Sequence, residues 1–370
     1  MKIAIDCHTL EIEHWAGKEQ YLSSILRELN KIDKENDYIL YFRRKVFDDS
    51  KPFGNWKIKN INLPTPFWQL AVIIDLIISG ADWLIVPCTY LLPFLNIFVS
   101  SIVVVHDLTT FLPATRKTHK LMTRFKEKLL LRGALFNAKK IIAVSENTKK
   151  DLINFFKTDS HKIFVIGEAA QSRFKPVARD AAMKEKLAKY KVPGDFILFV
   201  GTLEPRKNIV TLINAYKSLI AAGGYDRYKL VLVGQTGWYY QEIFNRVKEL
   251  NLEDKVIFTG YISDDEVPYL LSVAHCFVYP SIYEGFGLPP LEAMSCGCPV
   301  ITSKLSSLPE VVGDAAILIN PNSKEEIYLA IKKILSDDNF RKDLIKKGLE
   351  RSKLFSWENA ASGYMKLYRS

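Results

Sequence analysis

The chain has 370 residues and a formal net charge of +10, with 48% hydrophobic and 25% charged residues. This length is too great for one ordinary hydrophobic core and predicts two domains, while the composition is typical of a soluble globular protein. The positive balance favours an anionic partner, such as nucleotide phosphates, nucleic acid or acidic lipid.

Cysteine content and hydropathy indicate in which cellular compartment the protein acts. The five cysteines form no repeated pairing pattern, which is typical of a reducing environment. Cys296 and Cys298 have no further Cys or His cluster that could complete a metal site. Residues 1–6 resemble a strand and not a secretory signal, and the apolar region 67–105 is interrupted by charges and prolines. We therefore expect a cytoplasmic protein without a metal or other cofactor.

The first half alternates short apolar runs with helical patterns. We expect strands at 3–6, 38–42, 83–86, 102–105, 141–144 and 163–166, and helices near 20–30, 67–79, 118–137 and 146–156. The segment 168–193 is rich in charge and lacks long apolar runs, so it should hold a linker and a surface helix.

The second half repeats the alternation. Strands are expected at 196–200, 230–233, 256–258, 276–279 and 300–302, with helices near 209–222, 239–250, 265–272, 289–296, 323–335 and 357–369. Such alternation predicts parallel sheets with crossover helices, and so an α/β protein of two similar halves. Ligands of such sheets bind at the carboxyl ends of the strands.

The first chemical motif is F-V-G-T-L-E-P-R-K-N-I, from Phe199 to Ile209. Its strand ends at Gly201, and Arg206 and Lys207 precede a helix start, where the helix dipole disfavours cations. A diphosphate placed between the cations and the helix would remove this misfit, because Arg offers a bidentate fork and Lys a movable point charge. A solvated basic turn is the alternative.

The second motif extends from Ser281 to Ile301 and contains Y-E-G-F-G-L-P-P-L-E-A-M. Gly285 and Gly287 leave backbone N–H groups uncovered near a helix start, which favours an anion. Glu284 and Glu292 flank this site and cannot bind phosphate themselves, so we expect them to accept hydrogen bonds from hydroxyl groups, which sugars supply. The motif therefore indicates a nucleotide-sugar site.

The E-x7-E spacing within this motif resembles the signature of the retaining glycosyltransferases of family 4, which have the GT-B fold. The resemblance implies two Rossmann-like domains with parallel sheets facing across a cleft. It assigns 1–172 to an N-terminal acceptor-side domain, 173–354 to a C-terminal domain that binds the nucleotide sugar, and 355–370 to a helix that crosses back to the first domain.

The same resemblance implies roles for individual residues. Glu284 would contact the transferred sugar and Glu292 the ribose, while Arg206 and Lys207 would neutralise the donor pyrophosphate in place of a metal ion. The remaining donor-site residues expected from these motifs are Gly201, Tyr261, Gly285, Phe286, Gly287 and Leu288. Tyr261 belongs to T-G-Y-I-S-D, which lies near the nucleotide base in relatives.

In the first half, V-V-V-H-D-L places His106 and Asp107 at the end of a buried strand. A histidine there is often structural, but the resemblance implies that His106 contacts the transferred sugar and that Asp107 belongs to the substrate site. Near the start, W-A-G-K-E-Q-Y keeps only Gly17 of the glycines usual in the family. That departure weakens the expected contact of this loop with phosphate or acceptor.

The segment 116–140 holds nine Lys or Arg residues against one acid, Glu127, with leucines and phenylalanine at helical spacing. It is either an amphipathic helix with a solvated basic face or a surface that docks on anionic lipid at the inner face of the cell membrane, since acceptors of such transferases are often lipid-linked.

These features predict a metal-independent, retaining glycosyltransferase that moves a hexose, with mannose from GDP-mannose favoured, to a glycan or lipid-linked acceptor in cell-surface polysaccharide (O-antigen) synthesis. A UDP-glucose-type donor is the nearest alternative, and a GT-B epimerase acting on a UDP-sugar is another. A non-catalytic nucleotide-sugar binding protein and a nucleic-acid binder are the remaining alternatives; the chain has no recognised nucleic-acid module, and we expect no nucleic-acid partner.

Overall fold

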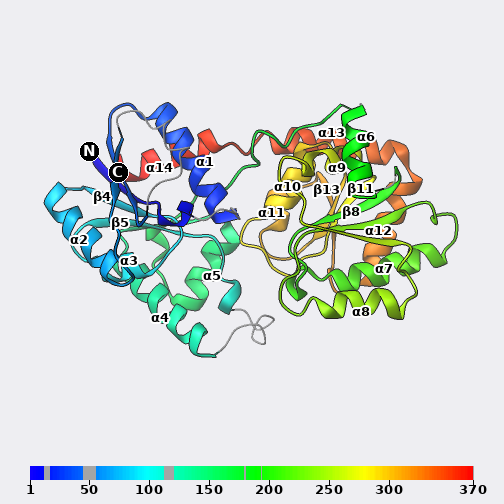
Figure 1. Cartoon of the computed structure of the whole chain (residues 1–370), viewed down its shortest axis with the longest axis horizontal. Coiled ribbons are helices and arrows are strands. Elements are labelled where there is room, and N and C mark those ends of the chain that lie inside the picture. The colour runs from blue at the N-terminus through cyan, green and yellow to red at the C-terminus, as the bar shows by residue number, and fades with distance from the viewer. Residues whose placement is uncertain (12–16, 45–55, 112–120, 179–180, 193, 370) are drawn as a thin grey trace. The chain divides into compact units, whose positions relative to one another are not determined.

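The computed structural model of the chain describes residues 1–11, 17–44, 56–111, 121–178, 181–192 and 194–369. The chain divides into two compact units (Figure 1). Unit 1 comprises Met1–Glu168 and Ser356–Ser370, and unit 2 comprises Ala169–Phe355. The chain therefore leaves unit 1 after Glu168 and returns to it at Ser356, so unit 2 is an insertion within unit 1.

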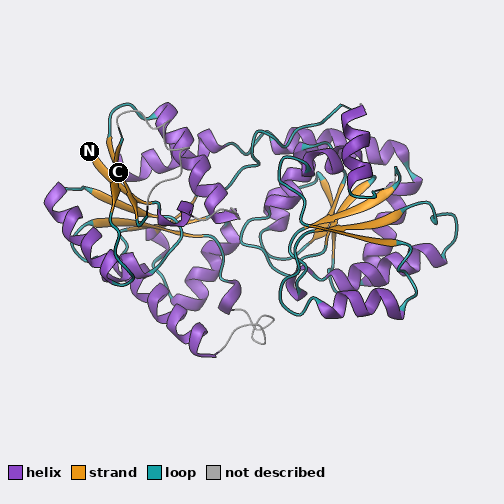
Figure 2. Cartoon of the chain, in the orientation of Figure 1, coloured by secondary structure: helices purple, strands orange, loops and turns teal. Residues whose placement is uncertain are grey.

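Unit 1 is built on a parallel sheet, whose order within the described residues is β3-β2-β1-β4-β5-β6-β7. Its strands are β1 (Lys2–Asp6), β2 (Asp37–Phe42), β3 (Lys57–Asn60), β4 (Trp83–Val86), β5 (Ser100–Val105), β6 (Lys140–Ala143) and β7 (Ile163–Val165). In the centre, Ile3 pairs with Tyr38 on one side and Trp83 on the other. The central strands β4, β5 and β6 are buried almost throughout because both faces of the sheet are covered by helices (Figure 2).

The helices of unit 1 are α1 (Gly17–Ile32), α2 (Phe67–Ser79), α3 (Leu91–Leu95), α4 (Leu121–Asn137), α5 (Glu146–Phe156) and α14 (Trp357–Arg369), with short 3-10 turns at His8–Glu11, Thr109–Phe111 and Ser160–Lys162. The connections from β3 to β4, β4 to β5 and β5 to β6 run in one direction across the sheet. Because such crossovers are right-handed, α2, α3 and α4 lie on the same face, whereas α1, between β1 and β2, lies on the other. In agreement, α3 contacts both α2 and α4, and α14 packs against α1.

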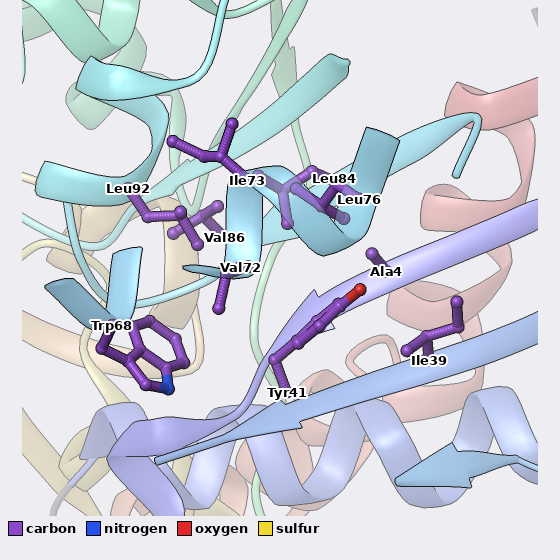
Figure 3. Packing of buried hydrophobic residues seen from close by; sticks show 10 residues of the cluster. All are labelled: Ala4, Ile39, Tyr41, Trp68, Val72, Ile73, Leu76, Leu84, Val86 and Leu92. Atoms are coloured by element: carbon purple, nitrogen blue, oxygen red, sulfur yellow. The ribbon is translucent and has the colours of Figure 1, made fainter. Parts of the chain in front are cut away.

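The hydrophobic core beneath α2 shows why this layer forms. Trp68, Val72 and Leu76 recur at helical spacing and point from α2 toward the strands, where they meet Tyr41 and Leu84 (Figure 3). All of these side chains are buried. The inner side of α2 is therefore held by apolar contact with the sheet.

The last helix completes unit 1 through hydrogen bonds between buried tyrosines. The hydroxyl groups of Tyr364 and Tyr21 lie 2.7 Å apart. Tyr368 donates to Asp33 Oδ2 at 2.7 Å, which also accepts from Tyr38 at 2.7 Å. Burial opposes the charge of Asp33, but hydrogen bonds from Tyr38, Asn36 and Tyr368 outweigh it and lower the pKa of the carboxyl group to about 2.

Unit 2 repeats the architecture around a parallel sheet with the order β10-β9-β8-β11-β12-β13 within the described residues. Its strands are β8 (Phe196–Val200), β9 (Lys229–Val233), β10 (Val256–Gly260), β11 (Cys276–Tyr279), β12 (Val300–Ser303) and β13 (Ala316–Ile319). Its helices are α6 (Ala181–Lys189), α7 (Ile209–Ala221), α8 (Gln241–Glu249), α9 (Val267–Val273), α10 (Leu288–Ser295), α11 (Leu308–Val312), α12 (Lys324–Ser336) and α13 (Asp338–Ser352), with a 3-10 turn, η6, at Pro205–Lys207.

The α/β class and the two parallel sheets agree with the sequence prediction, and several elements were not predicted. The strands β3 and β13 are short and only partly buried, so their apolar pattern is weak. The helices α3 and α11 have five residues each, too few for a helical period to stand out. Helix α13 is rich in charge and buries few of its side chains. The predicted helix from 118 begins at Leu121, and the residues before it lie outside the described ones.

Across the described ranges, none of the helices combines the length and the apolar character needed to cross a bilayer.

We predict that Tyr368→Phe lowers the free energy of unfolding by about 1–2 kcal/mol, because it removes the hydrogen bond that Tyr368 donates to the buried carboxylate of Asp33 and its contact with the Tyr38 hydroxyl group. Urea denaturation would measure this. Tyr240→Phe, at a half-exposed site in unit 2, is the matched control and should leave stability unchanged within about 0.5 kcal/mol. Equal stability of the Tyr368 and Tyr240 variants would contradict a stabilising role of this network.

Candidate functional site

Two glycines bring the loops after β8 and β9 into contact at the carboxyl edge of the unit 2 sheet. Gly201 donates to the carbonyl of Val233 at 2.9 Å, and a Cβ on Gly234 would lie 2.0 Å from the carbonyl oxygen of Gly201. Both glycines have positive φ, at 151° and 143°. No other residue fits at Gly234 without moving the neighbouring backbone, so this glycine fixes the start of the loop that carries Arg206 and Lys207.

Arg206 and Lys207 form the end of the 3-10 turn η6, immediately before α7. Asn208 takes a left-handed conformation, φ 57°, and turns the chain into the helix. The Arg206 carbonyl accepts a hydrogen bond from Ile282 at 2.9 Å, which ties this turn to the loop after β11. Two cations are thus held at the start of α7, as the sequence predicted, where the helix dipole opposes them.

Glu284 is the anion between these cations. It is 9% exposed, and its two oxygens accept separate partners. Oε2 accepts from Arg206 Nη1 at 2.8 Å, and Oε1 accepts from Lys207 Nζ at 2.7 Å. Oε1 also accepts from the hydroxyl groups of Tyr279 at 2.9 Å and Ser281 at 2.6 Å. The three charged residues that the sequence assigned to one site therefore lie in contact. We call these three residues, Tyr279 and Ser281 the Glu284 cluster.

Burial and the neighbouring charges shift the pKa of each charged group in the Glu284 cluster. Burial opposes ionisation of Glu284, but Lys207 and Arg206 outweigh it and lower the pKa to about 2. Burial likewise opposes the charge of Arg206, yet Glu284 raises its pKa. For Lys207 burial prevails and lowers the pKa. Lys207 is consequently the more easily neutralised of the two cations.

Outside this cluster, Glu204 accepts from Arg206 Nε at 3.0 Å and Nη2 at 2.7 Å. Arg206 is therefore held by a carboxylate on either side, and its guanidinium plane is fixed. The two acids formally balance the charges of Arg206 and Lys207, so the site is neutral before any ligand arrives.

The glycine-containing loop after β11 leads directly into α10. Gly285 and Phe286 are buried, and Gly287 is the residue before the helix, with φ 121°. A Cβ on Gly287 would lie 2.8 Å from the side chain of Leu308, so a larger residue would push the loop away from α11. Leu288 is the first residue of α10, one position earlier than predicted.

Two further predicted donor-site residues lie on the same edge of unit 2. Glu292 is half-buried in α10, one turn after Leu288. Tyr261 follows β10 and is 55% exposed, with Asp264 and Arg173 near its hydroxyl. β10 and β11 are separated in the sheet by β9 and β8, so Tyr261 lies on the outer side of this edge relative to the Glu284 cluster.

In unit 1, His106 follows β5 and is 8% exposed. Its Nε2 lies 2.9 Å from the carbonyl oxygen of Pro87, and its Nδ1 lies 3.0 Å from Glu168 Oε1. Both partners accept hydrogen bonds, so both ring nitrogens donate and the ring is an imidazolium. Tyr21 packs edge-on against the ring, with centroids 4.6 Å apart.

The pKa of His106 agrees with this protonation state. Burial acts to lower it, but hydrogen bonds with Cys88 and Glu168 and the charge of Glu168 raise it to about 9. Both ring nitrogens of His106 thus have a partner within unit 1, and Glu168 is the last residue of the first of its two segments. The histidine joins the end of β5 to the segment that leaves unit 1.

The other two predicted residues of unit 1 lie at the same edge of its sheet. Asp107 is next to His106 and accepts from the backbone N–H of Thr109 at 3.0 Å. Gly17 is exposed and is the first residue of α1; a Cβ there would meet no atom within 4 Å. Space therefore does not require glycine at this position, and Trp15, from the same motif, lies outside the described residues.

Sequence reasoning missed the residues that orient the charged groups. Tyr279, Ser281 and Glu204 in unit 2 and Glu168 in unit 1 were not singled out. Ser281 and Glu204 lie inside motifs that were recognised, so polar residues next to the cations were an available signal. Glu168 had none, because it is 62 residues from its partner His106.

Comparison with known proteins adds to this geometry. The family described as "Glycosyl transferases group 1" matches residues 181–351. O-antigen chain mannosyltransferase B of Escherichia coli is 38% identical over 265 residues, which are 71% of this chain and 68% of that protein. Serotype-specific mannosyltransferase WbdA of Escherichia coli is 34% identical over 290 residues, 76% of this chain but 35% of that protein. The match therefore spans about a third of the length of WbdA.

Two solved structures have the same fold. Sucrose-phosphate synthase from Thermosynechococcus elongatus superimposes with a TM-score of 0.79 at 23% identity, covering 100% of this chain and 98% of that one. Anabaena HepE in complex with UDP-glucose gives a TM-score of 0.79 at 17% identity, covering 100% of both chains. These likenesses show a GT-B-like fold.

We predict that Glu284→Gln destabilises the protein by roughly 3 kcal/mol at pH 7, because the buried Lys207 loses its counter-ion and Arg206 keeps only Glu204. The pKa of Glu284 is depressed in the folded state, so its stabilisation is present above its ordinary pKa near 4.5 and is lost as pH falls toward about 2. The stability difference from the wild-type protein should therefore shrink between pH 5 and 2. Thermal unfolding across this range measures it, with the exposed Glu325→Gln as control; a difference independent of pH would contradict the ion-pair assignment.

We predict the opposite pH dependence for His106. Its pKa is raised in the folded state, so its stabilisation is present below its ordinary pKa of 6.5 and is lost as pH rises through about 9. Urea unfolding at pH 6 and pH 9.5 should show His106→Gln less stable than wild-type protein at pH 6, with the gap narrowed at pH 9.5. His161→Gln, at an exposed site, should follow the wild-type curve. A gap of equal size at both pH values would exclude the buried imidazolium.

Proposed function

Because this chain belongs to the family of group 1 glycosyltransferases, we propose that it transfers mannose from GDP-mannose to a growing cell-surface glycan. Glycosyl transfer is the activity of the family, and the names of both curated relatives above specify mannose, that of mannosyltransferase B also O-antigen. The donor base, the individual site residues and the acceptor are the proposed parts.

The observation that carries the proposal is the Glu284 cluster at the carboxyl edge of the unit 2 sheet. Two cations, Arg206 and Lys207, are pre-positioned beside the glycine loop that begins α10. This edge is where open α/β sheets bind ligands. A diphosphate would place its oxygens against the cations, since Arg and Lys are the residues that recognise phosphate.

The proposed roles of the two carboxylates, Glu284 and Glu292, are those that the resemblance to the family implies. We assign Glu284 to the transferred sugar and Glu292 to the ribose, with the backbone of Gly285 to Leu288 next to the phosphates. Glu284 holds four hydrogen bonds without ligand, so a sugar hydroxyl must share or replace one of them. Two further residues complete the proposed donor site. Tyr261 is assigned to the nucleotide end, and Gly201 to the start of the loop that carries Arg206 and Lys207.

In the transfer step, the anomeric carbon of the sugar loses its bond to the diphosphate oxygen and gains one to the acceptor hydroxyl oxygen on the same face. The proton of the acceptor passes to the departing diphosphate. Charge develops on the leaving group, so Arg206 and Lys207 stabilise the transition state without a metal ion. Positioned cations of this kind cost no reorganisation when the bond breaks.

The unit 1 residues are assigned to the sugar and acceptor side. We propose that His106 acts near the transferred sugar, with Asp107 and Gly17 in the substrate site. Because both nitrogens of His106 have protein partners, the ring presents a fixed positive charge and not a free base. Its contribution would then be electrostatic orientation.

A UDP-sugar such as UDP-glucose remains the second candidate donor, and epimerisation of a UDP-sugar the second candidate reaction. The HepE structure contains UDP-glucose, but its likeness concerns the fold alone. Formation of an epimer without any acceptor would favour the epimerase. Transfer that requires an acceptor would favour the glycosyltransferase.

We also propose that the protein acts at the inner face of the cell membrane, with peripheral contact through residues 116–140 and a glycan or lipid-linked acceptor. Lys126, Lys128 and Arg132 are exposed on α4. Residues 116–120 lie outside the described ones, so the described part of this contact is α4 and the residues up to Lys140.

Calorimetric titration with GDP-mannose and then UDP-glucose, both with EDTA present, tests the proposal. We expect one donor to bind without metal and Lys207→Ala to abolish that binding. In turnover, loss of Arg206 or Lys207 should cost roughly 3 kcal/mol, a factor of about a hundred or more in rate. The exposed Lys332→Ala is the matched control and should bind donor as the wild-type protein does.

Failure of every nucleotide sugar to bind, or equal binding by Lys207→Ala, would contradict the proposed donor site. A thermal unfolding curve for Lys207→Ala must accompany the titration, because the lysine is buried and its loss leaves Glu284 with one cation.

A further inference from the structure

Helix α2 is apolar on the side that faces away from the sheet as well as on the side that faces it. Its exposed residues lie on one face: Phe67 at 59%, Leu70 at 46%, Ile74 at 58%, Ile77 at 52% and Ile78 at 77%. These large side chains recur at intervals of three and four residues. A helix that is apolar all round normally has a partner on both sides, and within the described residues α2 has the sheet on one side and α3 beside it.

The charge on α2 does not interrupt this face. Asp75 is the single ionisable residue of the helix. Its carboxylate accepts from Lys59 at 2.6 Å and from the hydroxyl group of Tyr41 at 2.5 Å, both on neighbouring strands. The carboxylate of Asp75 is therefore paired with groups of the sheet, and the outer side of α2 carries apolar residues.

The apolar surface continues along the same helical layer. Ile97 and Phe98, directly after α3, are 72% and 66% exposed. On α4, the exposed residues Met122, Phe125, Leu129 and Phe136 follow at helical spacing, at 67%, 65%, 54% and 82%. Since α3 contacts both α2 and α4, we call the outer sides of these helices together the α2–α4 face.

Cations are interleaved with the apolar residues at the α4 end of this face. Lys126, Lys128 and Arg132 are exposed on α4, and Glu127 is half-buried between them. This is the pattern of a helix that lies in a membrane interface, with apolar side chains among the acyl chains and cations at the level of the phosphates.

A groove of ≈ 530 Å³ extends the face from α4 to the end of α5. Its apolar wall contains Phe94, Leu129, Phe136 and Phe156, and Arg132, Lys157 and Lys162 bring positive charge to it, against Asp159. Gly133 also lines the groove. A Cβ there would lie 2.2 Å from the ring of Phe94, so a larger residue would displace this ring. The groove thus combines an apolar wall with a basic edge, which suits an anionic amphiphile.

We propose that the α2–α4 face, with this groove, docks unit 1 on a bilayer that contains anionic phospholipid. The proposal deepens the membrane contact proposed for α4 and rests on that part of the proposed function. Its new content is that α2 supplies the inserted surface. With 13 residues, α2 is about 20 Å long, which is shorter than the roughly 30 Å hydrocarbon core, so it can lie in the interface but cannot cross it.

A second copy of this chain fits the face less well than a bilayer does. In a two-fold symmetric contact the same patch faces itself. Each copy would then bring an excess of cations to the contact, with Lys126, Lys128 and Arg132 against Glu127, and two surfaces of like net charge repel. An anionic lipid surface instead pairs these cations while it covers the apolar residues.

The groove lies away from the proposed substrate residues of unit 1. The last turns of α4 and α5 lead into β6 and β7, so the groove lies at the amino ends of these strands. His106 and Asp107 follow the carboxyl end of β5. Docking through this groove therefore occupies the opposite edge of the sheet from the proposed substrate residues.

Co-sedimentation of the full chain with vesicles tests the inference. The probes are vesicles of phosphatidylcholine alone and of an equal mixture with phosphatidylglycerol, at low and high salt. The double variant Ile74→Glu, Ile78→Glu should weaken binding to the mixed vesicles by about a hundredfold or more. The double variant Lys126→Glu, Lys128→Glu should lose the preference for phosphatidylglycerol. Lys126 is a better choice than Arg124, whose Nε donates to the carbonyl of Thr110.

The matched control is Leu329→Glu with Leu354→Glu, two exposed apolar residues of unit 2 at 51% and 63%. This variant should bind vesicles as the wild-type protein does. Equal binding by the α2 variant and the control would overturn the proposal, as would a wild-type protein that does not bind mixed vesicles. A wild-type dimer in sedimentation velocity that the α2 variant disrupts would assign the face to a second copy and also overturn it.

Donor titration separates this inference from the proposed reaction. The α2 variant should bind the nucleotide sugar with wild-type affinity, which also shows that it is folded, and Lys207→Ala should bind vesicles with wild-type affinity. Vesicle binding without any donor binding would remove the proposed donor site and leave docking intact. Donor binding without vesicle binding would exclude the proposed docking and leave the proposed donor site intact.

Discussion

One buried carboxylate, Glu284, holds two cations at a helix start that would otherwise repel them. Arg206 and Lys207 are separated from it by more than 70 residues of sequence, and they meet because β8 and β11 are neighbours in the sheet. The close approach of Gly201 and Gly234 and the hydroxyl groups of Tyr279 and Ser281 all serve this arrangement. The cations are therefore oriented before any ligand arrives, and the free energy of ordering them is part of folding.

The sequence predicted which residues form this site better than which of them contact one another. The glycines, the Arg-Lys pair and the two glutamates lie in short motifs whose local chemistry indicates an anion and a sugar. The ion pair between Glu284 and the cations could not be predicted, because local spacing says nothing about which strands become neighbours. The same is true of His106, whose partner Glu168 follows a different strand.

The limits of periodicity explain the other differences. β3 and β13 are short strands at sheet edges with mixed burial, so alternation gives little signal there. For α2, the pattern predicted a helix but not its exposed side, because apolar residues occupy both sides and periodicity cannot separate an inner from an outer face. Burial in the structure makes that separation: Trp68 and Leu76 are covered by strands, whereas Ile74 and Ile78 are not.

The return of the chain to unit 1 has a consequence for biosynthesis. Helix α14, whose tyrosines meet Tyr21 and Asp33, follows unit 2 in the chain and is synthesised after it. Unit 2 is continuous in sequence and is synthesised in full before that helix exists. The nascent unit 1 therefore lacks the cover that α14 gives to α1 throughout this interval, and unit 2 can fold first although it is translated second.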